Sequence, residues 1–110
     1  MAATHIAADA TLNDQPGIAA TVDLGAGHAV DATNGNITEN NGLVYLYVTA
    51  TAADATFHTV RPEGPDQVHN IASTTHLYVL GPFEADEFGP SVEWHGLATT
   101  TVRVVQLLIP

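Results

Sequence analysis

Apolar and polar side chains alternate with period two along much of this chain, and that spacing is typical of β-strands. The clearest segment, residues 43–51, follows an Asn-Gly turn signal at 41–42. Both of its faces carry apolar or aromatic side chains, as expected of a strand near the middle of a sheet. Residues 99–109 are equally rich in β-branched side chains and predict a second long strand at the end of the sequence.

Shorter alternating segments, separated by Gly, Pro and Asn turn residues, predict further strands. They are residues 18–23, 28–32, 55–61, 68–72, 75–80 and 91–95. A turn at 53–54 is expected to join 43–51 and 55–61 in a hairpin, and Asn34-Gly35 is a hairpin-type turn. Residues 83–90 are expected to form a structured loop.

These elements predict an all-β fold, an antiparallel β-sandwich or jelly roll of about seven to nine short strands. The 110 residues contain no repeat or linker, so we expect a single domain over 1–110. Residues 1–17 are expected to form an N-terminal arm that is either extended or helical, because Thr4 to Leu12 is rich in Ala and fits both. The predicted core comprises Val44, Leu46, Val48, Phe57, Leu77, Val79, Val92, Trp94, Val102, Val104 and Leu107.

Composition excludes several classes of chemistry. The chain has no Cys and no Lys, which removes disulfides, thiol nucleophiles and Schiff-base lysines. Twelve acidic residues against two basic ones give a net charge of −10, so nucleic acid and anionic membranes are disfavoured partners. No apolar segment is long enough to span a bilayer, and we expect no secretion signal. The acidic balance indicates a high-GC or salt-adapted source.

The six histidines raise the question of a metal site, but none of their spacings places two imidazoles on one face of a helix or strand. A site built across strands from His58, His76 and His95 stays open. Ser73 and Ser91 lie outside any nucleophile-elbow motif. We therefore expect no metal, no cofactor, no catalytic residue and no small-molecule substrate.

Acidic residues gather before and beside the only tryptophan, at Glu84, Asp86, Glu87 and Glu93. Such carboxylates can act as a glycosidase pair or bind calcium, although their spacing matches no calcium loop, and a solvated acidic loop is the simpler interpretation. Trp94 with Glu93 supports an alternative function, a small carbohydrate-binding β-sandwich module. A hydrolase that uses Glu84 or Glu93 is a third interpretation.

Three features occur together: Asn-Asn-Gly before the long apolar strand (40–51), a strand ending at Leu80-Gly81-Pro82-Phe83 with Phe88 soon after, and a closing strand that contains Val102 to Leu107. This combination resembles the small β-sandwich capsid decoration and minor head proteins of tailed bacteriophages and related viruses. The resemblance covers residues 40–109. The chain departs from that family in having no Lys, and its first forty residues match nothing in it.

The resemblance implies a non-enzymatic virion structural protein on the capsid surface, made in the host cytoplasm. Its expected partners are the major capsid protein and copies of itself. The loop after Gly81 is the expected contact surface, with Phe83 and Phe88 forming an apolar centre and Glu84 and Asp86 at the rim. Such a contact should strengthen as salt screens the repulsion between carboxylates.

Overall fold

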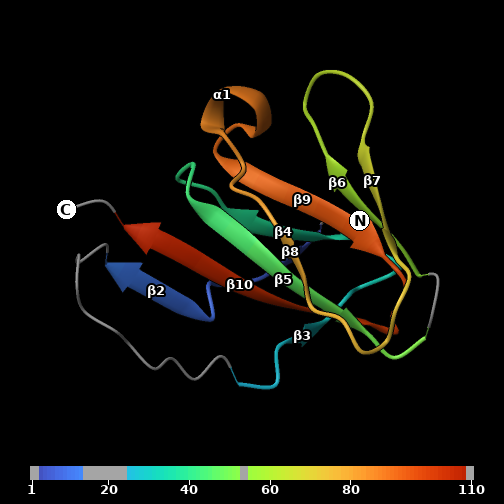
Figure 1. Ribbon diagram of the computed structural model, residues 1–110. Coiled ribbons are helices and arrows are strands. Elements are labelled where there is room, and N and C mark those ends of the chain that lie inside the picture. The colour runs from blue at the N-terminus through green and yellow to red at the C-terminus, as the bar shows by residue number, and fades with distance from the viewer. Residues whose placement is uncertain (1–2, 14–24, 53–54, 109–110) are drawn as a thin grey trace.

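The chain folds into two packed β-sheets, as a computed structural model that describes residues 3–13, 25–52 and 55–108 shows (Figure 1). One sheet has the strand order β1-β4-β9-β6-β7; the other has the order β2-β10-β5-β8, with β3 also paired to β10. The strands are β1 (Thr4–His5), β2 (Ala10–Asn13), β3 (His28–Ala29), β4 (Asn36–Glu39), β5 (Val44–Ala50), β6 (Ala55–Val60), β7 (Gln67–Ile71), β8 (Tyr78–Leu80), β9 (Ser91–Gly96) and β10 (Thr100–Leu108). The predicted all-β sandwich is confirmed.

Most neighbouring strands are antiparallel, and the two parallel pairs, β1 with β4 and β2 with β10, both involve the N-terminal segment. That segment is extended, so the described part of the predicted arm is not helical. A short helix, α1 (Ala85–Phe88), lies within the predicted loop at 83–90. No helix among the described residues is long and apolar enough to cross a membrane. The strand predicted at 18–23 lies outside the described residues.

The predicted hairpin between 43–51 and 55–61 is wrong. β5 pairs with β10 and β8, whereas β6 pairs with β7 and β9 in the other sheet. The predicted turn residues 53–54 lie outside the described residues. Asn34-Gly35 does form a turn, closed by a 3.0 Å hydrogen bond from the Gly35 N–H to the Asp31 carbonyl. It is not a hairpin turn either, because β3 and β4 belong to different sheets.

The core lies between the two sheets and is formed by alternate side chains of the central strands. Val44, Leu46, Val48, Phe57, Val92, Trp94, Val102 and Val104 are buried, as predicted. Leu107 is only partly buried. Ile71, Phe83 and Phe88 join the same cluster without having been predicted. The long central strands β5 and β10 thus supply the core positions that their alternation indicates.

The core prediction is wrong for Leu77 and Val79, which are 53% and 54% exposed. In β8 the side chains that pack against the core are those of Tyr78 and Leu80. The predicted phase was therefore displaced by one residue, which exchanges the inner and outer faces of a strand. Residues 77–80 are all apolar, so alternation alone does not distinguish the two phases.

The N-terminal segment closes one side of the sandwich by joining both sheets. Ile6 is buried between β1 and β2, and its carbonyl accepts a 2.7 Å hydrogen bond from the Thr38 hydroxyl. Asp9 exchanges hydrogen bonds with the backbone of Val104: its N–H donates at 2.8 Å and its carboxylate accepts at 2.7 Å. His28 lies 2.8 Å from the other oxygen of the same carboxylate. These contacts attach the N-terminal segment, which contains β1 and β2, to the two sheets.

Asp31 fastens β1 to the turn before β4. Its carboxylate accepts hydrogen bonds from the Thr4 hydroxyl at 2.7 Å and from the backbone N–H groups of Asn34 and Thr33 at 3.0 and 3.1 Å. These bonds, chiefly the one from Thr4, lower the pKa of Asp31 to about 2. These structural hydrogen bonds explain the low pKa of Asp31, so its carboxylate is not a candidate for acid or base chemistry.

Candidate interaction surface at the sandwich edge

The aromatic residues that sequence reasoning placed at a contact surface are inside the molecule. Phe83 is 3% and Phe88 5% exposed, and their rings meet edge to face with centroids 5.0 Å apart. The predicted apolar centre of the loop is therefore wrong, because these rings pack against each other and the core of their own chain. Glu84 and Asp86 are exposed on the outside of the same segment, as a rim would require.

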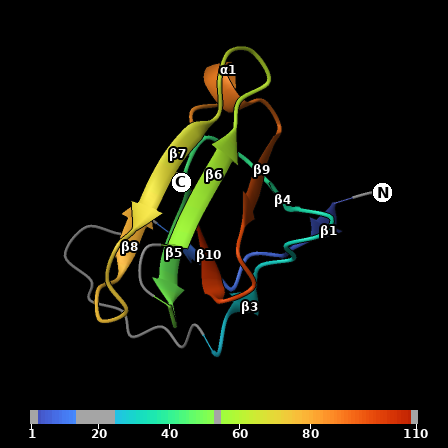
Figure 2. The same ribbon diagram turned by 90° about the vertical axis from the view of Figure 1, so that its right-hand side faces the viewer.

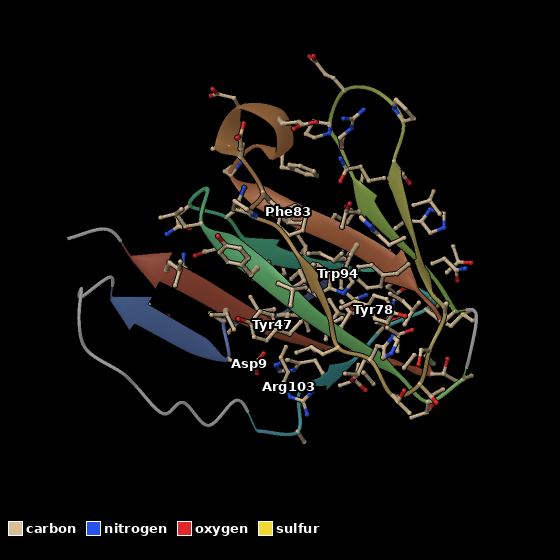
Figure 3. The ribbon with its side chains drawn as sticks, in the orientation of Figure 1. Asp9, Tyr47, Tyr78, Phe83, Trp94 and Arg103 are labelled. Atoms are coloured by element: carbon tan, nitrogen blue, oxygen red, sulfur yellow. The ribbon has the colours of Figure 1, made fainter. Side chains whose placement is uncertain are left out.

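The predicted carbohydrate-binding site at Trp94 and Glu93 is also wrong. Trp94 is 1% exposed and faces the core from β9, between the two sheets in Figure 3. Glu93, its neighbour in the strand, points to the opposite face, where its carboxylate lies 2.6 Å from the His95 ring. Adjacent strand residues alternate faces, so Trp94 and Glu93 cannot line one sugar site.

The candidate metal ligands come together only in part. His58 and His95 are directly opposite each other in the β6 and β9 register, on the outer face of their sheet. His76 belongs to the segment before β8 in the other sheet, where its ring lies 6.2 Å from that of Tyr78. Within residues 3–13, 25–52 and 55–108, no group of three or more His, Asp or Glu side chains is arranged to hold a metal ion.

Three exposed apolar side chains lie instead on or beside the end strands of the two sheets. β7 and β8 are the end strands of their respective sheets, and they lie on the same side of the sandwich in Figure 2. Val68 on β7 is 62% exposed, and Leu77 and Val79 at β8 are exposed by about half. Val68 shares the outer face of its sheet with His58, and Val79 shares the outer face of the other sheet with Tyr47. We call the margin of the sandwich that these two end strands form, with the exposed Val68, Leu77 and Val79, the β7–β8 edge.

A groove of about 320 Å³ runs between the two strands of the β7–β8 edge. Gln67 and His69 line it from β7, and residues 79–84 line it from β8 and the segment that follows. Phe88 contributes to its floor and Glu87 to its wall, both from α1. The exposed lining of the groove is therefore mainly polar, with the carboxylates of Glu84 and Glu87 at its α1 end.

A second hollow, of about 370 Å³, lies beside the N-terminal segment and is lined by residues 5–8 together with Thr38, Glu39 and Gln106. The Thr38 hydroxyl is already bonded to the Ile6 carbonyl. We find no set of side chains in this hollow that converges on a ligand, so the β7–β8 edge is the stronger candidate.

Asn40 holds the segment that floors the groove, a role that sequence reasoning missed. Its buried side-chain amide donates hydrogen bonds to the carbonyls of Phe83, at 2.9 Å, and Gly89, at 3.0 Å. Its side-chain oxygen accepts the N–H of Gly42 at 3.0 Å. The Asn-Asn-Gly sequence signals that last, local bond. The two bonds to residues more than forty positions away have no sequence signal.

Replacing Asn40 with Ala is expected to lower the free energy of unfolding by about 1–3 kcal/mol, because it leaves buried carbonyls without a donor. The Phe83 and Phe88 ring resonances in an NMR spectrum should shift as the segment loosens. Asn41→Ala is the matched control: Asn41 accepts an equivalent local bond from the Leu43 N–H and donates a long-range bond to the Leu107 carbonyl, but both bonds are exposed. Equal losses of stability in both variants would contradict the role given to Asn40.

His69 is the titratable group that lines the groove from β7. Its Nε2 lies 3.3 Å from the Thr59 hydroxyl, and its ring packs at 6.4 Å from that of Phe57. Burial, and then the charge of His58, lower the pKa of His69 below its usual 6.5. The imidazole is therefore uncharged at neutral pH in the folded chain.

Because the unfolded chain binds this proton more readily than the folded one, stability should decline as the pH falls below about 6.5 and through the lower folded pKa. His69→Gln should reduce that decline. Denaturant unfolding between pH 7.5 and 5, with NMR titration of the ring, measures both quantities. An identical pH dependence in wild type and His69→Gln would show that another group is responsible.

Comparisons with protein-family models, with curated proteins and with solved structures find no match to this chain. Any proposal about its function therefore rests on the arrangement of its own residues.

Proposed function

We propose that this chain is a non-enzymatic structural protein of a virus particle, a capsid decoration or minor head protein that binds the major capsid protein and its own copies. The observation that carries the proposal is the β7–β8 edge. Natural β-sheet proteins usually protect their end strands with charge, proline or a covering segment, since a free strand edge invites pairing with another chain. This edge instead exposes Val68, Leu77 and Val79 on strands that have no outer partner among the described residues.

The rest of the molecule is consistent with a binding role. The core supports both end strands from inside the sandwich: Ile71 of β7 is buried, Tyr78 and Leu80 of β8 pack inward, and β5 pairs with β8 over residues 46–48. Exposed carboxylates at Glu84 and Asp86 keep the neighbouring surface hydrated, as the rim of a protein interface requires. The proposal therefore assigns the contact to the edge, in place of the loop aromatics expected from the sequence.

Genes for a major capsid protein, a maturation protease and a portal are expected beside the gene for this chain. Empty shells assembled from that neighbouring capsid gene should bind the protein in a co-sedimentation assay, and cryo-electron microscopy should show added density on their outer surface.

The edge is tested by Val68→Ser combined with Val79→Ser, which should reduce shell binding by about tenfold or more, since central apolar contacts dominate interface energy. Leu97→Ser is the matched control, because Leu97 is also 53% exposed but lies between β9 and β10. Shells that bind the double variant as well as wild type would reject the edge as the contact. A protein that binds no shell at all would reject the virion role.

A further inference from the structure

The β7–β8 edge has a shape suited to an extended segment. β8 pairs with β5 on one side only, so its other side is open to a further strand within the described structure. The groove lies along that open side and continues to α1. A strand added there would direct every second side chain toward the groove floor and the others toward solvent.

Charge at the α1 end of the groove favours a cationic partner. Glu84 and Glu87 both line the groove, and nearly half of the Glu87 side chain remains exposed. The chain itself shows that a guanidinium fits here: Arg61 donates to the Glu87 carboxylate at 2.6 Å and to the Pro65 carbonyl at 3.1 Å. The same carboxylates can accept further charge-assisted hydrogen bonds from outside.

A second copy of this chain is poorly suited to supply that cation. It has only two basic residues, Arg61 and Arg103. Arg61 is engaged as described, and Arg103 donates to the carbonyls of Gly25 and Ala26 at 3.1 and 3.3 Å. Two copies also carry ten net negative charges each, and their approach is repulsive. These charges favour a different, more basic chain as the partner at this edge.

We propose that the β7–β8 edge binds a short extended segment of a different protein, in which apolar residues alternate with Lys or Arg. Its backbone adds to the open side of β8, its apolar side chains contact the exposed Val79, and its cations pair with Glu84 and Glu87. The proposal rests on the proposed function, whose edge it uses, and assigns the edge to the heterologous partner. Contacts between copies then belong elsewhere on the surface.

The test is an NMR titration of the whole chain with two capped synthetic peptides, one alternating Lys with Val and the other alternating Glu with Val. The Lys peptide is expected to shift the backbone amides of residues 67–69 and 77–84 and to bind about tenfold or more tightly than the Glu peptide at low salt. Its affinity should fall as NaCl is raised, because salt screens the charge pairs.

Three variants locate the contact. Val79→Ser and Glu84→Gln should each weaken binding of the Lys peptide by about threefold or more, through lost apolar contact and lost charge respectively. Glu39→Gln is the control for charge, since Glu39 is exposed on β4, three places along the sheet from β7. Equal binding of both peptides, or shifts confined to other surfaces, would overturn the proposal. So would self-association of the free chain that Val79→Ser abolishes.

The two proposals fail separately. If the Lys peptide binds the edge but capsid shells do not bind the protein, the virion role is wrong and the preference of the edge for basic segments stands. If shells bind through Val68 and Val79 but the Lys and Glu peptides bind equally well, the virion role stands and the proposal of a basic extended partner is wrong.

Discussion

Replacement of Trp94 with Ala is expected to lower the free energy of unfolding by about 3–5 kcal/mol, the usual cost of removing a large buried aromatic side chain. Trp94 is 1% exposed and is among the largest fully buried side chains of the described residues. In a chain of this size the change should reduce Tm by roughly 10–30 °C. Thermal unfolding followed by circular dichroism measures it directly.

Trp94→Phe refines this prediction. Among the described residues the indole Nε1 has no hydrogen-bond partner, so phenylalanine gives up no bond to them and preserves much of the packing. It should therefore destabilise the chain less than alanine does. Leu97→Ala, on the exposed turn after the same strand, should change stability by about 0.5 kcal/mol or less. A Trp94→Ala protein with wild-type stability would mean that the ring is at the surface, as a sugar platform would require.

Gly81→Ala is expected to produce the second large effect, because two separate costs act at this position. The backbone φ of Gly81 is +122°, a conformation that costs a residue with a Cβ about 1–3 kcal/mol. A Cβ would also lie 2.6 Å from the Val44 carbonyl oxygen, which belongs to the central strand β5 and cannot move freely. Overpacking of this kind adds about 1–3 kcal/mol.

Gly89→Ala separates the two costs. Gly89 also has a positive φ, of +80°, but a Cβ there would meet no atom within 4 Å. Its substitution should cost only the backbone term. Chemical denaturation of the two variants gives the difference, and a Gly81→Ala loss no larger than that of Gly89→Ala would show that β5 and the end of β8 adjust to the added methyl group. The Gly81 variant should also perturb the groove, because residues 79–84 line it.

The sequence predicted the all-β class and the long strands correctly because β5 and β10 alternate over many residues with strong β-formers. In β5 one face carries only aliphatic side chains and the other carries two tyrosines and a threonine, and the aliphatic face, with residues 44, 46 and 48, is the buried one. Turn residues also ended the strands where expected, at Pro62 and at Gly81-Pro82. These are local properties, and local interactions suffice to decide them.

Tertiary structure decided what the short and uniformly apolar segments do. Residues 77–80 fit either phase, and the packing of Tyr78 and Leu80 on the core selected one of them and left Val79 outside. β5 and β6 entered different sheets because each found long-range partners, which no turn signal encodes.

The candidate surface depended on the same long-range choices. The loop aromatics pack against the core, and Asn40, distant in sequence, bonds to the carbonyls of Phe83 and Gly89 in the same segment. The apolar edge exists because β7 and β8 became the end strands of two different sheets. The sequence by itself determined the strands and the acidic, lysine-free surface. Only the assembly of the two sheets decided which apolar side chains remained available to a partner, since that depends on which strands end up without neighbours.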